Sequence, residues 1–255
     1  MLKRLLLGSG IILTFALGAA GQTDWKGFYA GGNVGVTAGR ATADTSTVFT
    51  AAGYFANSSV ATINLGGRQK LQPNRLNGGG QVGYNWQSGH LVYGVEADFG
   101  AMPLSNAIGF ASNYPCCSPA TFTVNQQLKT RWLFTARPRV GYTVGHVLLY
   151  ATGGVAVTDI NYQELFTDTF ASAHESGGVK QNKGGWVAGF GIEYQLPSNQ
   201  HWSIKGEYLY ADFLRGTATS TNLTAPAATA WPQNVFTHSI ELHTHIIRGG
   251  VNYRW

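Results

Sequence analysis

Apolar residues alternate with small or polar residues along eight segments of the chain, and this pattern predicts β-strands with one apolar and one polar face. In the third segment, Leu91, Tyr93 and Val95 alternate with Gly94 and Glu96. The segments lie at residues 28–37, 81–86, 91–99, 131–142, 147–157, 186–195, 202–210 and 247–255. Eight such strands of about ten residues each are typical of a transmembrane β-barrel.

Short and long connections alternate between these segments. The short connections lie at residues 87–90, 145–146 and 197–200, and the long ones at about 41–75, 101–127, 159–182 and 216–236. In an outer-membrane barrel, short turns face the periplasm and longer loops face the outside. We therefore predict an all-β fold, an eight-stranded antiparallel transmembrane β-barrel with four long extracellular loops and short periplasmic turns.

The first twenty residues have the organisation of a secretory signal peptide. Lys3 and Arg4 carry positive charge, residues 5–17 are largely apolar, and three small residues follow. The apolar stretch is shorter than the roughly 20 residues that a membrane-spanning helix needs. We predict a signal peptide at residues 1–20 and one barrel domain at residues 21–255.

Composition narrows the class of protein further. Only 11% of the 255 residues are charged and 34 are glycine, whereas an ordinary soluble domain has about 25% charged residues. These values argue against a disordered chain, a coiled coil and a cytosolic enzyme. The chain has 17 basic and 12 acidic residues. Without Lys3 and Arg4 of the leader, the small remaining excess of positive charge does not imply a nucleic-acid partner.

The two cysteines, Cys116 and Cys117, are adjacent in the sequence. A bond between neighbours closes no loop of the chain, so the sequence predicts no disulfide scaffold. We expect a free or oxidised thiol pair at the tip of the second long loop. No CxxC pair is present, and structural zinc is therefore not expected.

Charged residues fall on the strand face opposite the apolar residues, so a barrel would point them into its lumen. The set is Glu96, Asp98, Arg131, Arg137, Arg139, Glu193, Lys205, Glu207 and Arg248. An isolated buried ion is severely penalised, so these charges must pair. Because the third and fourth segments are neighbours, we expect Glu96 and Asp98 to pair with Arg137 and Arg139 and to form a plug that blocks conductance.

A soluble β-sandwich would show the same alternation, with its polar face in water. Aromatic residues near the short connections, among them Trp86, Tyr194 and Trp202, favour a membrane barrel, because aromatic girdles mark membrane interfaces. After residue 20 no apolar run is long enough for a spanning helix, so strands must carry any membrane embedding.

Three stretches of the chain resemble one known family. Residues 24–35 (DWKGFYAGGNVG) resemble its first strand, residues 78–86 (GGGQVGYNW) its second and residues 248–255 (RGGVNYRW) its last. The family is that of small alphaproteobacterial outer-membrane β-barrel "porin family" proteins, the 25/31-kDa surface-antigen group with OmpA/OmpX-like barrels. The resemblance covers the strands of the mature chain and not its loops.

This resemblance implies export to the outer membrane of a Gram-negative cell. It also implies that Val251, Tyr253 and Trp255 form the terminal signal that the barrel-assembly machinery reads. Most members end in Phe, and Trp255 departs from that pattern. Members of the family include porins, structural surface proteins and haemin-binding proteins.

Other motifs carry weaker functional suggestions. Gly78, Gly80 and Gly83 match a dinucleotide fingerprint, but a strand follows them where the fingerprint needs a helix. His243 and His245 share a strand face with Glu241, and His238 lies just upstream. The two histidines are weak candidates for haem binding, and polar residues above the membrane edge are the preferred interpretation.

Ser239, Glu241 and His243 are close in sequence, but no nucleophile elbow or oxyanion loop accompanies them. We therefore predict no enzyme, no catalytic residue, no cofactor and no metal site.

Three functions follow from the sequence. The first is a structural envelope protein whose loops meet lipopolysaccharide, a host or the environment. The second is a narrow passive pore for small solutes, and the third is a surface protein that binds haemin or another ligand at its loops. Expected partners are outer-membrane lipid, lipopolysaccharide and the barrel-assembly machinery, and no nucleic acid. The sequence leaves the oligomeric state open.

Overall fold

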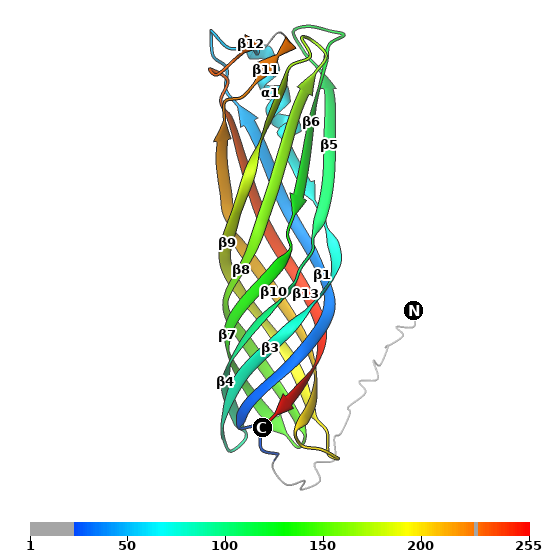
Figure 1. Cartoon of the computed structure of the whole chain (residues 1–255), viewed down its shortest axis with the longest axis vertical. Helices are drawn as coiled ribbons and strands as arrows, with labels where there is room; N and C mark the ends of the chain where they lie inside the picture. Colours follow the sequence, from blue (N-terminus) through cyan, green and yellow to red (C-terminus); the bar gives the residue numbers. More distant parts are fainter. Residues whose placement is uncertain (1–22, 227–228) are drawn as a thin grey trace, which may run out of the picture.

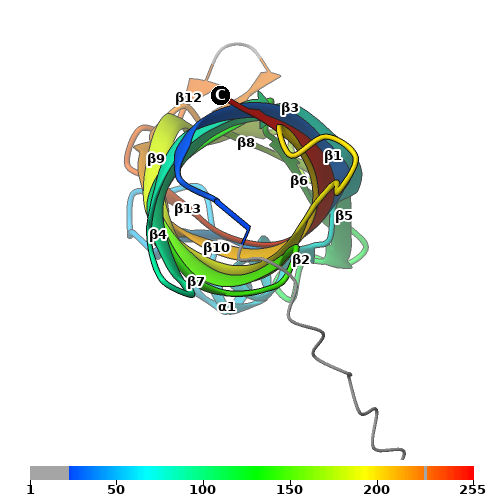
Figure 2. The same cartoon turned by 90° about the horizontal axis from the view of Figure 1, so that it is seen from below.

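Eight long antiparallel strands close into a barrel in the computed structural model (Figures 1 and 2). The structure describes residues 23–226 and 229–255, so the predicted signal peptide at residues 1–20 lies outside the described residues. The barrel strands are β1 (Gly27–Thr47), β3 (Asn74–Ser88), β4 (Leu91–Ala101), β7 (Trp132–Val144), β8 (Val147–Asp168), β9 (His174–Gln195), β10 (Trp202–Ser220) and β13 (Phe236–Arg254). The predicted eight-stranded antiparallel barrel is confirmed.

The first and last strands close the ring. β1 pairs with β13 from Tyr29 opposite Arg254 to Thr47 opposite Phe236. The Trp255 backbone N–H donates to the Phe28 carbonyl oxygen at 3.1 Å. A closed ring leaves no unpaired strand edge, which is what a barrel in lipid requires.

Tight turns join the strands at one end of the barrel, at the three predicted places. Gly89 lies in the turn between β3 and β4, and Gly145 in the turn between β7 and β8. Both have φ of +57°, a left-handed conformation that glycine adopts without strain. The link between β9 and β10 is longer and includes Pro197.

The four long connections differ from the prediction, because strands fill most of them. β1 continues to Thr47, β8 to Asp168 and β10 to Ser220. Burial alternates along the extensions of β1 and β8, and the register of β10 shifts between Phe213 and Gly216. The remaining elements of these regions are α1 (Asn57–Gly67), β2 (Arg68–Leu71), β5 (Ser105–Asn113), β6 (Thr121–Lys129), β11 (Thr224–Ala225) and β12 (Thr229–Ala230). The strands in these regions are rich in Ala, Thr, Ser and Asn and keep the two-residue alternation of burial, but they have few of the large apolar residues of a lipid-facing wall.

These additional strands extend the barrel wall away from the tight turns. β2 pairs with β1 beyond the end of β3, and β6 pairs with β8 beyond the end of β7. β5 forms a hairpin with β6, and α1 lies at the far end of the barrel (Figure 1). Since about 9–11 residues of a strand cross a bilayer, roughly half of the 22-residue strand β8 extends beyond it.

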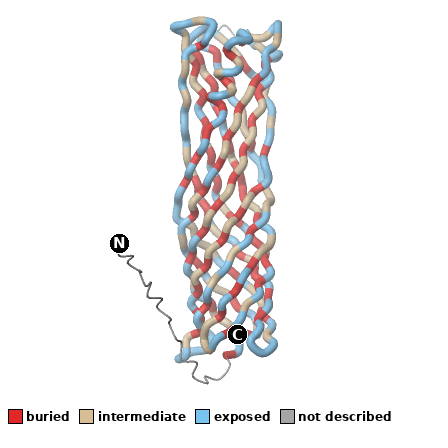
Figure 3. Tube along the Cα trace, turned by 180° about the vertical axis from the view of Figure 1, so that it is seen from behind, coloured by how far each residue is buried: buried red, intermediate tan, exposed pale blue. Residues whose placement is uncertain are grey.

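Large apolar side chains point outward along the half of the barrel nearer the tight turns. Val34 is 72% exposed and Phe190 64%, values that make sense against lipid and not against water. The band also includes Val36, Leu76, Val82, Val95, Phe99, Val140, Leu149, Val155, Ile192, Ile204, Ile247 and Val251. Buried and exposed residues alternate along the strands (Figure 3). Among the described residues, no helix is long and apolar enough to cross a bilayer.

Side chains fill the barrel in successive layers. Trp25, Val92, Leu148 and Tyr150 pack together near the tight turns, and charged side chains follow. An apolar layer then includes Leu133, Leu209, Leu242 and Ile246. The far end is closed by a cap of packed residues, namely Phe55, Ile63, Tyr114, Phe122, Val124, Phe166, Ala173, Leu223 and Phe236.

The closed ring predicts resistance to unfolding by detergent. Folded protein should migrate differently from boiled protein on a detergent gel, because closure satisfies the backbone and leaves no edge from which strands fray. Circular dichroism of the unboiled sample should be rich in β-structure. Identical migration of both samples, together with solubility in detergent-free buffer, would contradict a membrane barrel.

Candidate functional site: the charged layer inside the barrel

Eight buried ionised side chains form a layer across the barrel, here called the charged layer. Its members are Glu96, Asp98, Arg137, Arg139, Glu193, Lys205, Glu207 and Arg248. Strand alternation points each of them inward, and β4 pairs with β7 so that Glu96 lies opposite Arg137. Each side chain is 4% exposed or less.

Arg137 lies between three carboxylates. Its Nη2 atom donates to Glu96 Oε1 at 2.6 Å and to Asp98 Oδ2 at 2.8 Å. Its Nη1 atom donates to Glu207 Oε1 at 3.2 Å from the other side of the lumen. The guanidinium therefore joins β4 to β10 directly across the interior of the barrel.

Arg248 makes the second connection across the lumen. Its Nη1 and Nη2 atoms donate to the two oxygens of Asp98 at 3.1 and 3.0 Å, a bidentate arrangement that carboxylates favour with arginine. Its Nε atom donates to Glu207 Oε2 at 2.7 Å. Lys205 completes this part of the layer, with Nζ 3.0 Å from both oxygens of Glu96.

Arg139 and Glu193 form the part of the layer nearer the tight turns. Arg139 Nη1 donates to Glu193 Oε2 at 3.0 Å, and its Nε donates to Asn85 Oδ1 at 2.9 Å. The other oxygen of Glu193 accepts hydrogen bonds from Ser203 and Asn252. Every carboxylate of the layer thus has a cationic partner.

Two tyrosines belong to the same layer, although the sequence analysis did not identify them. Tyr29 donates to Glu96 Oε2 at 2.8 Å and Tyr150 donates to Glu207 Oε1 at 3.0 Å. The Arg139 guanidinium lies 4.5 Å from the Tyr29 ring centroid and 5.2 Å from that of Tyr150. Their place on the polar face of their strands was the available signal, because a large ring there must point into the lumen.

The layer is balanced in charge. Four cations, Arg137, Arg139, Lys205 and Arg248, meet four carboxylates, Glu96, Asp98, Glu193 and Glu207. With Tyr29, Tyr150 and Asn85, all eight barrel strands contribute a side chain. Pairing offsets the large cost of burying ions, and the contacts fix the relative positions of the strands.

Comparison with known proteins identifies the family. The sequence profile described as "Outer membrane protein beta-barrel domain" matches residues 8–254. The chain belongs to this family. It is therefore an outer-membrane barrel of a Gram-negative bacterium, as the residues of its strands predict.

Two curated relatives come from alphaproteobacteria. The 31 kDa outer-membrane immunogenic protein of Brucella melitensis is 29% identical over 180 residues, which cover 70% of this chain and 65% of the relative. The 22 kDa outer membrane protein of Rhizobium leguminosarum is 31% identical over 137 residues, covering 53% of this chain and 52% of the relative. The outer-membrane barrel thus matches less than two thirds of either relative's length.

Two solved outer-membrane protein structures align with most of this chain at low identity. OprG of Pseudomonas aeruginosa has 12% identity and a TM-score of 0.48, with 90% of this chain and 97% of that chain covered. The outer membrane protease OmpT of Escherichia coli has 9% identity and a TM-score of 0.47, with 92% and 98% covered.

Arg131 does not belong to the charged layer of this outer-membrane barrel, contrary to the sequence-based expectation. Its side chain is 79% exposed and pairs with Asp159, with Nε 2.7 Å from Oδ2. Arg131 precedes the first residue of β7, where Asp159 also accepts from the Arg131 backbone N–H. Because Arg131 lies outside the strand, the alternation of inward and outward side chains along β7 does not apply to it, and its side chain points outward.

The histidines proposed as weak haem candidates lie on the outer wall. His243 Nδ1 is 3.1 Å from Asp212 Oδ1 and 3.3 Å from the hydroxyl of Tyr210, and His245 Nδ1 is 2.8 Å from that of Tyr208. The nearby Glu241 pairs with Arg215. His243, His245 and Glu241 therefore each contact side chains on β10.

The residues of the predicted assembly signal also face outward. Val251 is exposed, Tyr253 is half-buried and Trp255 is exposed. The Tyr253 ring packs edge-on against Trp202 and Trp255, with centroids 5.1 and 5.3 Å apart. These rings contribute to the aromatic girdle at the end with the tight turns.

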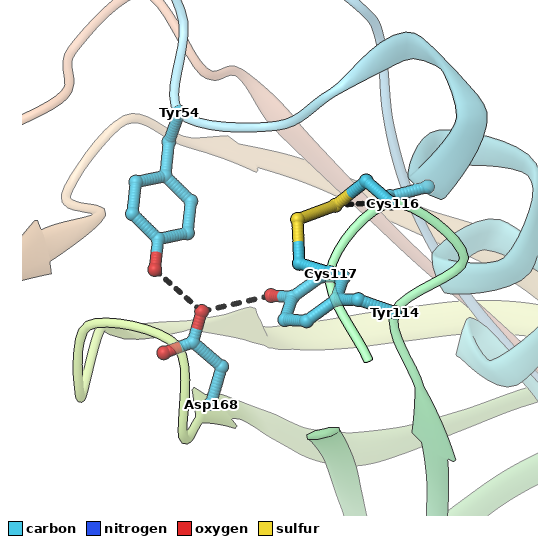
Figure 4. Close-up of a disulfide and its surroundings, with 6 residues drawn as sticks. Tyr54, Tyr114, Cys116, Cys117 and Asp168 are labelled. Atoms are coloured by element: carbon cyan, nitrogen blue, oxygen red, sulfur yellow. Dashed lines mark hydrogen bonds between the residues drawn. A yellow bond between two sulfur atoms is a disulfide. The ribbon is translucent and has the colours of Figure 1, made fainter. Parts of the chain in front are cut away.

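The far end of the barrel carries the cysteines, which form a disulfide next to the cap (Figure 4). Asp168 Oδ2 accepts hydrogen bonds from Tyr54 at 2.6 Å and Tyr114 at 2.8 Å. Burial, followed by the charge of Asp168, raises the pKa of the Tyr114 hydroxyl, so this tyrosine remains a donor at neutral pH. These contacts hold the connections at the far end against the barrel.

The charged layer predicts a large difference between two arginines. Arg137→Gln should lower the free energy of unfolding by about 3–5 kcal/mol, because it leaves buried carboxylates without their cation. The matched control Arg131→Gln should cost no more than about 1 kcal/mol, because the Arg131 guanidinium is exposed to solvent and Asp159 keeps its bonds from two backbone N–H groups. Urea unfolding in lipid or detergent measures both, and equal effects would contradict the buried network.

Proposed function

We propose that the protein is a structural and surface-interaction component of the outer membrane whose lumen does not conduct ions. The charged layer is the observation that carries this proposal. Arg137 and Arg248 reach carboxylates across the lumen, and the members of the layer are almost fully buried. A path for solutes would have to break these contacts.

The dimensions of the barrel support the same function. An eight-stranded barrel is just wide enough for side chains to fill its interior. The apolar layer next to the charged layer includes Leu209, Leu242 and Ile246, which are buried. A hydrated ion passing through the barrel would have to displace both layers, so the narrow-pore alternative is the weaker one.

The part of the barrel beyond the bilayer supports a role at the cell surface. The tight turns face the periplasm, so the long extensions of β8 and β9 and the hairpin of β5 and β6 face outward. Polar side chains, among them Asn125, Gln127 and Gln163, line an open groove on this wall. The Brucella relative is named an immunogenic protein, and we propose that this surface likewise meets lipopolysaccharide, a host or the environment.

Planar-bilayer recording tests the proposal directly. The wild type should show no steady conductance steps under conditions in which an open porin conducts. The variant Glu96→Gln/Arg137→Gln should also remain closed, because Arg248 still joins Asp98 to Glu207 across the lumen and the apolar layer stays in place. A large steady conductance in the wild type would contradict the proposed function and favour a passive pore.

We also propose that the barrel-assembly machinery recognises the outward residues of the last strand. Deleting residues 253–255 removes two rings of the girdle and the N–H of Trp255 that bonds to Phe28. Much less protein should reach the outer membrane, measured by fractionation and gel migration. Deletion of Ala51 and Ala52, which are exposed and lie at the opposite end of the barrel from residues 253–255, serves as the control. Normal assembly of the tail deletion would refute this assignment.

A further inference from the structure

A second group of buried charged side chains lies between the apolar layer and the cap, here called the acid–histidine cluster. It consists of Glu164 on β8, Glu175 on β9 and His238 on β13. One ligand atom from each residue lies within 4.8 Å of the others. All three side chains are 0% exposed.

The cluster lacks the cations that balance the charged layer. Both carboxyl oxygens of Glu164 and the Oε2 atom of Glu175 have no hydrogen-bond partner among the described residues. Within residues 23–226 and 229–255, the one ion-pair partner of either carboxylate is His238, 3.8 Å from Glu164 Oε2 and 3.5 Å from Glu175 Oε1. Two buried carboxyl groups facing one imidazole cannot both be ionised without leaving negative charge uncompensated, which is costly in a dry interior.

The same imbalance affects the ionisation of the pair. Burial, together with the neighbouring Glu175, holds the pKa of Glu164 well above its usual range. Burial opposes ionisation of Glu175 as well, but interactions with His238, Glu164 and Ser220 outweigh it and lower its pKa. A cation that binds both carboxylates would remove the conflict between them.

Neighbouring residues hold the imidazole of His238 between the carboxylates. Thr45 Oγ1 lies 3.0 Å from Nδ1, and Ser220 Oγ lies 2.8 Å from Nε2. Gly177 pairs with Glu164 across β8 and β9, and a Cβ atom there would lie 2.1 Å from His238 Nε2. The absence of a side chain at Gly177 therefore makes room for the ring. Metal-ligating histidines have a hydrogen-bond partner on the second ring nitrogen that fixes the orientation of the imidazole.

We propose that Glu164, Glu175 and His238 bind one divalent transition-metal ion of the zinc class. Imidazole suits zinc and iron, and carboxylates add the negative charge that a divalent cation needs. Around zinc, with ligands at about 2.0–2.2 Å, neighbouring ligand atoms are about 3.4 Å apart. The observed atoms lie within 4.8 Å of one another, so small rotations of the side chains bring them to the ion.

A fourth protein ligand is available beside Glu164. Gln126 on β6 lies directly opposite Glu164 in the register, and its buried Oε1 atom has no hydrogen-bond partner among the described residues. The bound ion would connect β8, β9 and β13, three strands that extend beyond the bilayer. It would thereby stabilise the extension of the barrel that the proposed surface role requires, although the metal site does not depend on that role.

Zinc retention after refolding tests the site. The mature chain without a histidine tag is refolded in detergent with Zn²⁺, because the buried site is loaded most readily during folding, and free ion is removed by gel filtration. The wild type should retain one equivalent of zinc by elemental analysis. Glu164→Gln and His238→Gln should retain roughly a tenth of that or less, since each removes a ligand. Glu241→Gln and His243→Gln, on the outer face of the same part of β13, should retain the wild-type amount.

A second measurement guards against misfolding of the variants. Glu164→Gln keeps the size of the side chain, and its gel migration before boiling should equal that of the wild type. Zinc should raise the midpoint of thermal unfolding of the wild type and of His243→Gln, and leave that of Glu164→Gln unchanged. Absence of zinc from the refolded wild type would refute the metal site and leave a proton shared by the two carboxyl groups. Equal retention by the wild type and Glu164→Gln, or loss of zinc in His243→Gln alone, would refute it too.

Discussion

The pairing of eight ionised side chains inside a ring of eight strands is the constraint on which the structure depends. A charge that strand alternation points into the lumen has no water to solvate it, so it must find an opposite charge from another strand. Arg137 and Arg248 meet this requirement by bonding to carboxylates on β4 and β10 at once. The same contacts fix the relative positions of the strands and fill the lumen, so they both stabilise the barrel and block its interior.

The layers along the barrel differ in how their buried side chains are partnered. The charged layer is balanced, and the apolar layer beside it needs no partners for its side chains. The acid–histidine cluster is different, because its two carboxyl groups share one histidine and three of their four oxygens have no hydrogen-bond partner among the described residues. The other buried carboxylates of the described residues all accept from cations, hydroxyls or backbone N–H groups, so the unpartnered oxygens of the cluster are more informative than its composition alone.

The strands that cross the membrane could be predicted from the sequence. Lipid on one side and a narrow lumen on the other enforce a strict alternation of outward apolar and inward polar or small side chains. Eight of the nine residues expected to point into the lumen form the charged layer, and the ninth, Arg131, lies before its strand begins. The extension beyond the bilayer was missed, because Thr, Ala and Ser replace large apolar residues there. Tyr162, Glu164 and Phe166 nevertheless keep the two-residue period within a predicted loop. The partners of each side chain across the lumen depend on barrel closure, which local sequence patterns do not encode.

A double-mutant cycle on Asp98 and Arg248 tests the central claim most directly. The two side chains share a bidentate contact at 3.0 and 3.1 Å across the interior, and neighbours in one buried network are strongly coupled. Asp98→Asn and Arg248→Gln, alone and combined, should give a coupling free energy of about 2–3 kcal/mol in unfolding measured in lipid. Effects that add to within about 0.5 kcal/mol would show that the charges do not meet in the lumen and would contradict the account.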